Sequence, residues 1–236
     1  ANFATPPDGS APRMQMYLFD APTPDRDGDF DNGIIIHEYG HGVSNRLTGG
    51  PSNSGALNAQ QSGGMGEGWG DWHGLMLTQI ASDAANDPRG IGTYALNQPT
   101  TGPGIRTQRY SYDMSVNTHT YGSITSGLSV PHGVGEVWAT TLWDLNWALI
   151  GGSSLDPNLT NTGLGFDPDL INGTGGNNLA MQLVMDGMKL QPSSPTFLDA
   201  RDGILAADQA ANGGANQDTI WRVFARRGMG FNANDG

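Results

Sequence analysis

The sequence predicts an α+β fold in which most of the chain is helical and a short β portion lies at the N-terminal end. The segment MQMYLFD at 14–20 is rich in strand-forming residues and is the clearest strand. After residue 33, every segment has either a helical apolar pattern or the composition of a loop. The 36 glycines and 14 prolines among 236 residues require that loops take up much of the chain.

The first two helices are expected on either side of a polar loop. A Pro/Asp/Gly-rich loop at 21–33 leads into a helix over 33–47, which the sequence GGP at 49–51 ends. The segment 66–83 predicts a second helix despite its glycines, which indicate close packing against a neighbour.

Four further helices are expected after an irregular segment at 84–129. The strongest is 130–152, where Val137, Trp138, Leu142, Leu145 and Leu149 recur at helical spacing. The remaining three helices are predicted over 177–190, 196–211 and 217–228.

Composition excludes several classes of function. With 23 acidic and 11 basic residues, the net charge of −12 argues against nucleic acid or an anionic membrane as a partner. No apolar run approaches the roughly 18 residues of a membrane span. The chain has no cysteine, so any metal would be held by His, Asp or Glu. It starts at ANFATPPDG, without an initiator Met, and we expect a processed end or a fragment.

The segment HEYGH at 37–41 is the first candidate metal site. His37 and His41 are four residues apart, so both lie on one face of a helix and can aim a ring nitrogen at one ion. Glu38 follows the first histidine, where it can reach a water molecule beside the metal. Taken alone, this short pattern fits a pair of surface helix histidines about equally well.

A third ligand is expected downstream, because catalytic zinc takes three protein ligands and one open position. The segment GGMGEGWGD at 63–71 offers Glu67 as that ligand. Asp71, one turn later, would accept the remaining ring N–H of a ligand histidine, with His37 as the first choice. The alternative is that both acids are charges at a helix start, favoured by the helix dipole.

The blocks HEYGHGVSNRLTGGP, GGMGEGWGDW, VPHGVGEVWAT and GGANQDTIWRVFARRGMG resemble the fungalysin family of gluzincin metallopeptidases and occur in that family's order. The resemblance implies a thermolysin-like zincin fold with one zinc per chain. His37, His41 and Glu67 would bind the zinc, and Glu38 would be the general base. Residues 1–32 would be the end of a β-rich N-terminal lobe that is otherwise mostly absent, and 33–236 would hold the active-site helices and a C-terminal helical lobe.

The resemblance also implies two groups that act on the substrate. His132, in VPHGVGE, resembles the histidine that stabilises the oxyanion, although a lone histidine at a helix start is more often a capping or packing residue. Tyr121 is a candidate second oxyanion donor, with a buried aromatic as the equal alternative. Arg106 resembles the arginine that holds the substrate backbone; Arg109 is its rival, and a surface arginine is the alternative.

Four residues are candidates for contact with the substrate chain. Ile34 and Ile105 would line the pocket for the side chain after the scissile bond, or belong to the core. Ala1 and Asn2 resemble an edge strand that pairs with an extended peptide, or form a frayed terminus.

The acidic run PDRDGDFDNG at 24–33 raises the question of Ca²⁺. Counted from Asp25, the sixth position is Phe30 and the twelfth is Ile36, so the run is not an EF-hand. A calcium loop of another kind competes with a solvated acidic turn built from Asp25, Asp27, Asp29 and Asp31. His73 and His119 belong to no pattern and receive no role.

The resemblance therefore predicts a secreted zinc endopeptidase that acts on polypeptides and favours an apolar residue after the scissile bond. It also implies an inhibitory propeptide, and we expect a monomer. The alternative is an inactive fragment or a non-catalytic binding module that keeps the fold. The presence of Glu38 speaks against a decayed site.

Overall fold

A computed structural model describes residues 1–235, and its first 31 residues form two short antiparallel hairpins. Strand β1 (Asn2–Ala4) pairs with β2 (Arg13–Gln15), and β3 (Leu18–Phe19) pairs with β4 (Arg26–Asp27). The single strand expected over 14–20 is therefore divided. The chain exchanges one pairing partner for another between Gln15 and Leu18, so no continuous strand forms there.

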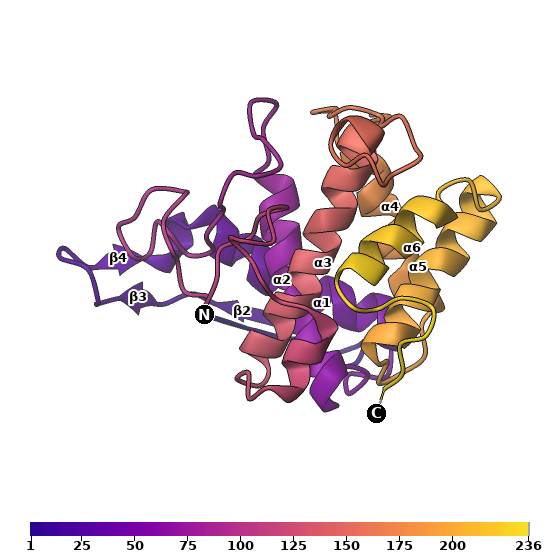
Figure 1. Ribbon diagram of the computed structural model, residues 1–236. Helices are drawn as coiled ribbons and strands as arrows, with labels where there is room; N and C mark the ends of the chain where they lie inside the picture. The colour runs from indigo at the N-terminus through magenta and orange to yellow at the C-terminus, as the bar shows by residue number, and fades with distance from the viewer. Residues whose placement is uncertain (236) are drawn as a thin grey trace.

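The rest of the described chain is helical or irregular, which confirms the predicted fold class. Helices α1 (Asn32–Gly49), α2 (Gln60–Leu77) and α3 (His132–Gly151) lie side by side, with α2 in contact with both of the others. Helices α4 (Gly176–Leu190), α5 (Phe197–Asn212) and α6 (Gln217–Arg226) lie beyond α3, whereas the strands lie on the opposite side of the molecule (Figure 1). Short 3-10 helices cover Gly28–Phe30, Tyr121–Thr125 and Gly152–Ser154.

A buried aspartate fixes the start of α1. The side chain of Asp31 accepts a hydrogen bond from the backbone N–H of Ile34 at 3.2 Å, which satisfies one of the unpaired donors at a helix N-terminus. Its other oxygen accepts from the N–H of Ala95 at 3.0 Å. Asp31 therefore ties the helix that carries the histidines to the irregular segment at 84–129.

Helix α2 begins and ends about six residues earlier than expected. The glycines that weaken the helical pattern at 63–68 are inside the helix, and at Gly64 and Gly68 α3 lies too close for larger residues. A Cβ atom at Gly64 would lie 2.4 Å from Val134 Cγ1, and one at Gly68 would lie 2.6 Å from the carbonyl oxygen of Gly135. After Leu77 the chain turns, and Asp83 accepts from the N–H of Ile80 at 3.1 Å.

Tryptophan packing holds α2 against α3. Trp69, Trp72, Trp138 and Trp143 are all 1% exposed or less. The rings of Trp69 on α2 and Trp138 on α3 meet edge to face, with centroids 5.8 Å apart, a favourable geometry for aromatic pairs. This contact packs α2 against α3 two residues after Glu67.

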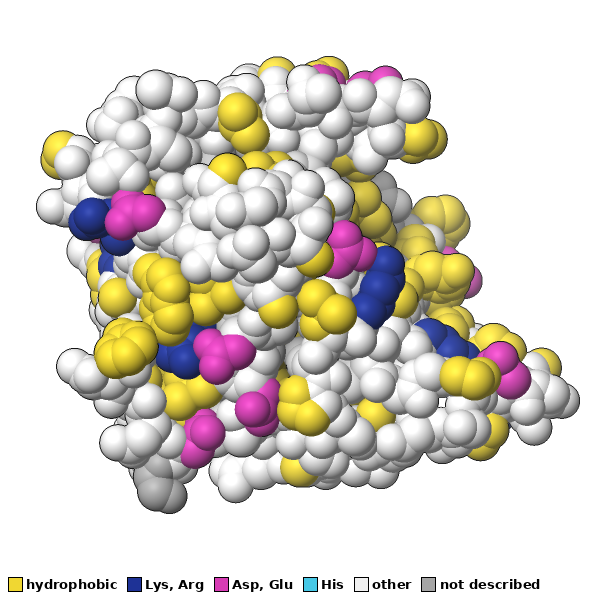
Figure 2. Space-filling model, turned by 90° about the vertical axis from the view of Figure 1, so that its right-hand side faces the viewer, with side chains coloured by type: hydrophobic (Ala, Val, Ile, Leu, Met, Phe, Trp, Pro, Cys, Tyr) yellow, Lys and Arg dark blue, Asp and Glu magenta, His cyan; other side chains and the backbone are white. Residues whose placement is uncertain are grey.

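The surface agrees with the acidic composition. On the face that carries α5 and α6, basic side chains are scattered and do not form a patch (Figure 2). Within residues 1–235, no helix combines the length and the apolar character needed to cross a bilayer.

Candidate metal and catalytic site

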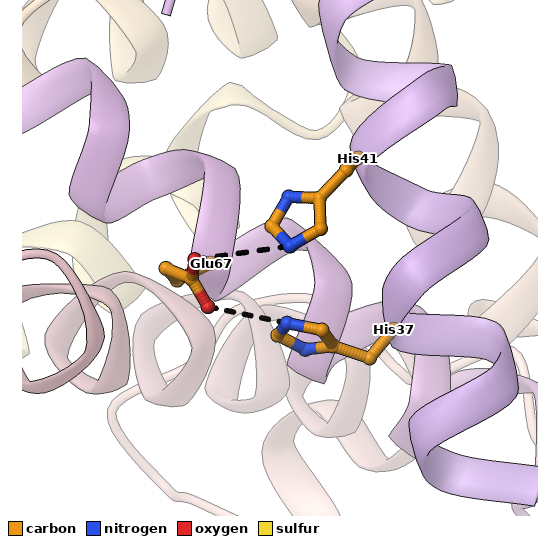
Figure 3. Close-up of side chains that lie close together, drawn as sticks. All are labelled: His37, His41 and Glu67. Carbon is orange, nitrogen blue, oxygen red and sulfur yellow. Dashed lines mark ion pairs between the residues drawn. The ribbon is translucent and has the colours of Figure 1, made fainter. Parts of the chain in front are cut away.

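Three side chains from two helices converge on one point. His37 and His41 project from α1 toward Glu67 on α2 (Figure 3). His37 Nε2 lies 3.1 Å from Glu67 Oε2, and His41 Nε2 lies 3.7 Å from Glu67 Oε1. Among the described residues, this is the one group of three or more His, Asp or Glu side chains whose donor atoms all lie within 4.8 Å of one another.

The donor set fits zinc. Two imidazole nitrogens and one carboxylate oxygen leave one position of a tetrahedral ion open, as in catalytic zinc sites. With zinc–ligand bonds of about 2.0–2.1 Å, donor atoms around a tetrahedral ion lie about 3.3 Å apart. The two histidine nitrogens lie at comparable distances, 3.1 and 3.7 Å, from the two oxygens of the Glu67 carboxylate, and one donor atom from each of the three residues lies within 4.8 Å of the others.

Asp71 supports the first histidine from behind. Its Oδ1 lies 2.8 Å from His37 Nδ1, so the other ring nitrogen, Nε2, faces Glu67. Asp71 also accepts two hydrogen bonds from Arg106, at 2.7 and 2.8 Å, and one from the hydroxyl of Tyr110 at 2.5 Å. Burial opposes ionisation of Asp71, but Arg106 and His37 outweigh it and hold the pKa of the carboxyl well below its ordinary value.

The two histidines differ in charge preference when no metal is bound. Burial works against protonation of His37, but Asp71 and Glu67 outweigh burial and raise its pKa to about 9. Burial and the neighbouring His37 lower the pKa of His41 to about 4. Metal ligands must be deprotonated, so a bound cation would displace the proton from His37.

Glu38 is buried beside these side chains, at 6% exposure. Its Oε2 has no hydrogen-bond partner within the described part of the chain. Burial raises the pKa of this carboxyl above its ordinary value. A raised pKa makes a carboxylate a better proton acceptor, and this suits a general base.

The converging side chains open onto a cleft of about 300 Å³. Its lining combines α1, α2, the start of α3 and the N-terminal strand: Ala1, Asn2, Phe3, His37, Glu38, His41, Asn45, Glu67 and His132. The side chain of His132 is 56% exposed, and its Nε2 lies 3.4 Å from Glu67 Oε2. The structure therefore brings Ala1, Asn2 and His132 to the same cleft as the candidate metal ligands.

Two glycines make this convergence sterically feasible. A Cβ atom at Gly70 on α2 would lie 2.7 Å from His37 Nδ1, and one at Gly135 on α3 would lie 2.7 Å from the Cβ of Glu67. Any other residue at either position would push a candidate ligand out of place.

The other residues expected to contact the substrate do not line the cleft. Arg106 is buried behind Asp71, with Nη2 3.8 Å from Glu67 Oε2, whereas its rival Arg109 donates to the carbonyl of Thr101. Ile34 is 4% exposed, and Ile105 is 42% exposed and packs over Gly92. Neither isoleucine is among the residues that line the cleft.

Tyr121 and the acidic run at 24–33 do not line the cleft. The hydroxyl of Tyr121 donates to Asp235 at 2.5 Å and its ring packs against Phe197, so this tyrosine belongs to the packing of the C-terminal helices and does not line the cleft. The aspartates of the acidic run do not converge on one point in the described chain. Asp27 and Asp31 instead cap the 3-10 helix at 28–30 and α1, which gives them a structural use without calcium.

Two groups near the site were not predicted from the sequence. Tyr110 hydrogen-bonds Asp71, and Glu136 on α3 binds the segment that follows Arg106. The one available signal was the position of Glu136, one helical turn after His132.

Comparisons with known proteins identify the family of the chain. The family model of the fungalysin metallopeptidases (M36) matches residues 1–233. The chain is 49% identical to "Extracellular metalloproteinase 3" of Arthroderma otae and 50% identical to the protein of the same name from Trichophyton tonsurans, over 99% of this chain and 35% of each relative. It is 46% identical to "Extracellular metalloproteinase 2" of Arthroderma gypseum, over 100% of this chain and 36% of that relative.

The chain thus spans about a third of the length of these curated relatives. The family model covers nearly all of the chain, and the matched residues include both helices that carry the candidate ligands. This chain belongs to the fungalysin metallopeptidase family.

Proposed function

We propose that this chain carries the zinc-binding and catalytic centre of a secreted endopeptidase. The observation that carries the proposal is the approach of Glu67 on α2 to both His37 and His41 on α1, in the cleft that Glu38 also lines. Secretion is proposed from the name "extracellular metalloproteinase" borne by the relatives. An inhibitory propeptide and one zinc per chain stay predictions from the family resemblance.

The chain would hold zinc through His37, His41 and Glu67. Zinc at that point supplies Lewis acidity, which polarises a carbonyl group and lowers the pKa of a water molecule. Glu38 accepts a proton from the attacking water and then delivers it to the departing amine. Its raised pKa and its place in the cleft support this role.

The negative charge that develops on the carbonyl oxygen of the substrate during attack needs a hydrogen-bond donor from the protein. His132 stands at the edge of the cleft on α3, more than half exposed, where a substrate carbonyl can reach its Nε2. A hydrogen bond made as negative charge develops stabilises the transition state more than the ground state. We assign this role to His132 and none to Tyr121.

An extended peptide would lie along β1. In the described chain this strand pairs on one side with β2, and Ala1 and Asn2 line the cleft. Addition of a peptide to a free strand edge is a common mode of peptide recognition. An apolar preference after the scissile bond stays a prediction from the family resemblance, because neither Ile34 nor Ile105 lines the cleft.

Hydrolysis of casein by the purified chain tests the proposal. We expect activity that a chelator abolishes and added zinc restores, with Glu38→Gln inactive in every condition. The alternative is a binding module that keeps the fold without catalysis. A chain that binds zinc at the three ligands but cleaves neither casein nor short peptides would favour that alternative.

A further inference from the structure

Glu136 is a buried carboxylate outside the catalytic centre, 2% exposed, on α3. A buried charge is costly unless it is paired and hydrogen-bonded, so its partners indicate its use. Oε1 accepts from the backbone N–H of Thr107 at 3.0 Å. Oε2 accepts from the Thr107 hydroxyl at 2.6 Å and from the N–H of Gln108 at 3.2 Å, and lies 3.2 Å from His119 Nε2.

Glu136 therefore binds the two residues that directly follow Arg106, Thr107 and Gln108. Two consecutive backbone N–H groups and one side chain donate to the same carboxylate, which fixes both the position and the direction of the chain at 107–108. Burial opposes ionisation of Glu136, but the hydrogen bonds from His119 and Thr107 outweigh it and hold the pKa of the carboxyl below its ordinary value.

The same segment also binds Asp71, through one residue before and one residue after those held by Glu136. Arg106 donates two hydrogen bonds to Asp71, and Tyr110 donates a third. Asp71 in turn contacts His37 Nδ1. A continuous set of contacts thus runs from α3, through residues 106–110, to Asp71 on α2 and His37 on α1.

A second contact with α3, made through Arg227, holds the end of the segment that carries His119. Arg227 is fully buried and donates to the carbonyls of Asn117 and His119. It also donates to both oxygens of Asp144 on α3, two turns after Glu136. His119 thus contacts Glu136 on one side and Arg227 on the other, and both ends of the segment at 107–119 are tied to α3.

A bidentate arginine pair depends on geometry more than most contacts do. The guanidinium and the carboxylate must be coplanar, and a shift of the backbone at residue 107 moves the origin of the Arg106 side chain. We infer that Glu136 is a positioning residue, which acts through Arg106 to hold Asp71, and with it the ring of His37, in register with the helix of His132. This inference rests on the proposed function, in which His37 would hold zinc and His132 acts on the substrate.

The variant Glu136→Gln tests this inference, because glutamine has nearly the same shape as glutamate. When the amide nitrogen takes the place of Oε2, the N–H of Gln108 loses its acceptor and faces a second donor. Displacements of about 1 Å can cost up to 10²-fold in rate, and we expect kcat/KM to fall by at least about 10-fold.

A matched control separates positioning from a general loss of packing. Asp208 on α5 is equally buried and accepts from the N–H of Asn216 at 2.9 Å and from the amides of Asn212 and Asn216, in a turn outside the cleft. Asp208→Asn should lower Tm while kcat/KM stays at the wild-type value.

The decisive measurement is a double-mutant cycle with Arg106→Lys, which keeps the charge but loses the planar fork. If Glu136 acts through Arg106, adding Glu136→Gln to Arg106→Lys costs no further kcat/KM. Two results would overturn the inference: the same fold-loss in both backgrounds, or wild-type kcat/KM in Glu136→Gln.

A measurement that needs neither zinc nor activity distinguishes failure of this inference from failure of the proposed function. The Nε–H of Arg106, which donates to Asp71, should exchange slowly with solvent in NMR spectra of the metal-free wild type and of Asp208→Asn, and fast in Glu136→Gln. Slow exchange in Glu136→Gln would sink the inference even if the peptidase activity is found. An inactive wild-type chain that shows the expected NMR pattern would sink only the proposed function.

Discussion

The ring nitrogen Nδ1 of His37 lies 2.8 Å from Oδ1 of Asp71, a carboxylate that also accepts three hydrogen bonds from Arg106 and Tyr110. When a bound cation displaces one proton from His37, this contact keeps the other proton on Nδ1 and leaves the lone pair on Nε2, which faces Glu67. The orientation of a candidate ligand is thus set by a residue on a different helix.

Asp71→Asn should weaken zinc binding by roughly 10–100-fold without destroying the site, because the partners of ligand histidines tune affinity on this scale. The measurement is competition for zinc with a chelator of known affinity. An unchanged dissociation constant would leave Asp71 with a structural role only, as the buried partner of Arg106 and Tyr110.

Glu38→Gln should abolish peptide hydrolysis while zinc content and Tm stay at wild-type values. The amide has nearly the same shape as the carboxyl but cannot accept the proton of the attacking water. Glu38 Oε2 makes no hydrogen bond in the described chain, so few contacts are lost. Loss of zinc in this variant would make Glu38 a ligand instead of a base.

His132→Ala should reduce kcat by about 10²–10³-fold, the usual cost of one lost oxyanion donor. The side chain is more than half exposed, so its removal should leave Tm and zinc content unchanged. Steady-state kinetics with a peptide substrate checks this. A wild-type kcat would remove His132 from the mechanism, and a parallel loss of zinc would make it part of the metal site.

Gly70→Ala should lower zinc affinity, because its Cβ would lie 2.7 Å from His37 Nδ1 and the ring must move. Gly66 is the matched control on the same helix, since a Cβ there meets only Leu57 Cδ1, at 3.9 Å. Gly66→Ala should stabilise the fold by about 0.4–1 kcal/mol through the unfolded state. Equal zinc affinities of the two variants would show that the fit of α2 against His37 is not tight.

The helices were predictable wherever the apolar spacing was regular. Helix α3, expected over 130–152, covers His132–Gly151. Helix α2 was placed six residues too late, because glycines at 63–68 resemble a loop in the sequence, whereas in the structure Gly64 and Gly68 let α3 approach. Local propensity cannot show this, since the neighbour that requires the glycines lies far along the chain.

The same reason limits prediction of the site. His37, Glu38 and His41 share one helical turn, so their convergence follows from helix geometry, and the need for a third ligand pointed to Glu67. Tyr110 lies in the irregular segment at 84–129, and so do the residues that donate to Glu136. Such a segment has no period that places its side chains.

Metal analysis of the purified chain beside its Glu67→Ala variant tests the central claim most directly. Glu67 lies within 3.7 Å of both histidines, and without it two ligands on one helix remain. The account predicts one zinc per chain in the wild type and in Glu38→Gln, and none in Glu67→Ala. Stoichiometric zinc in Glu67→Ala would contradict the assignment of the metal centre.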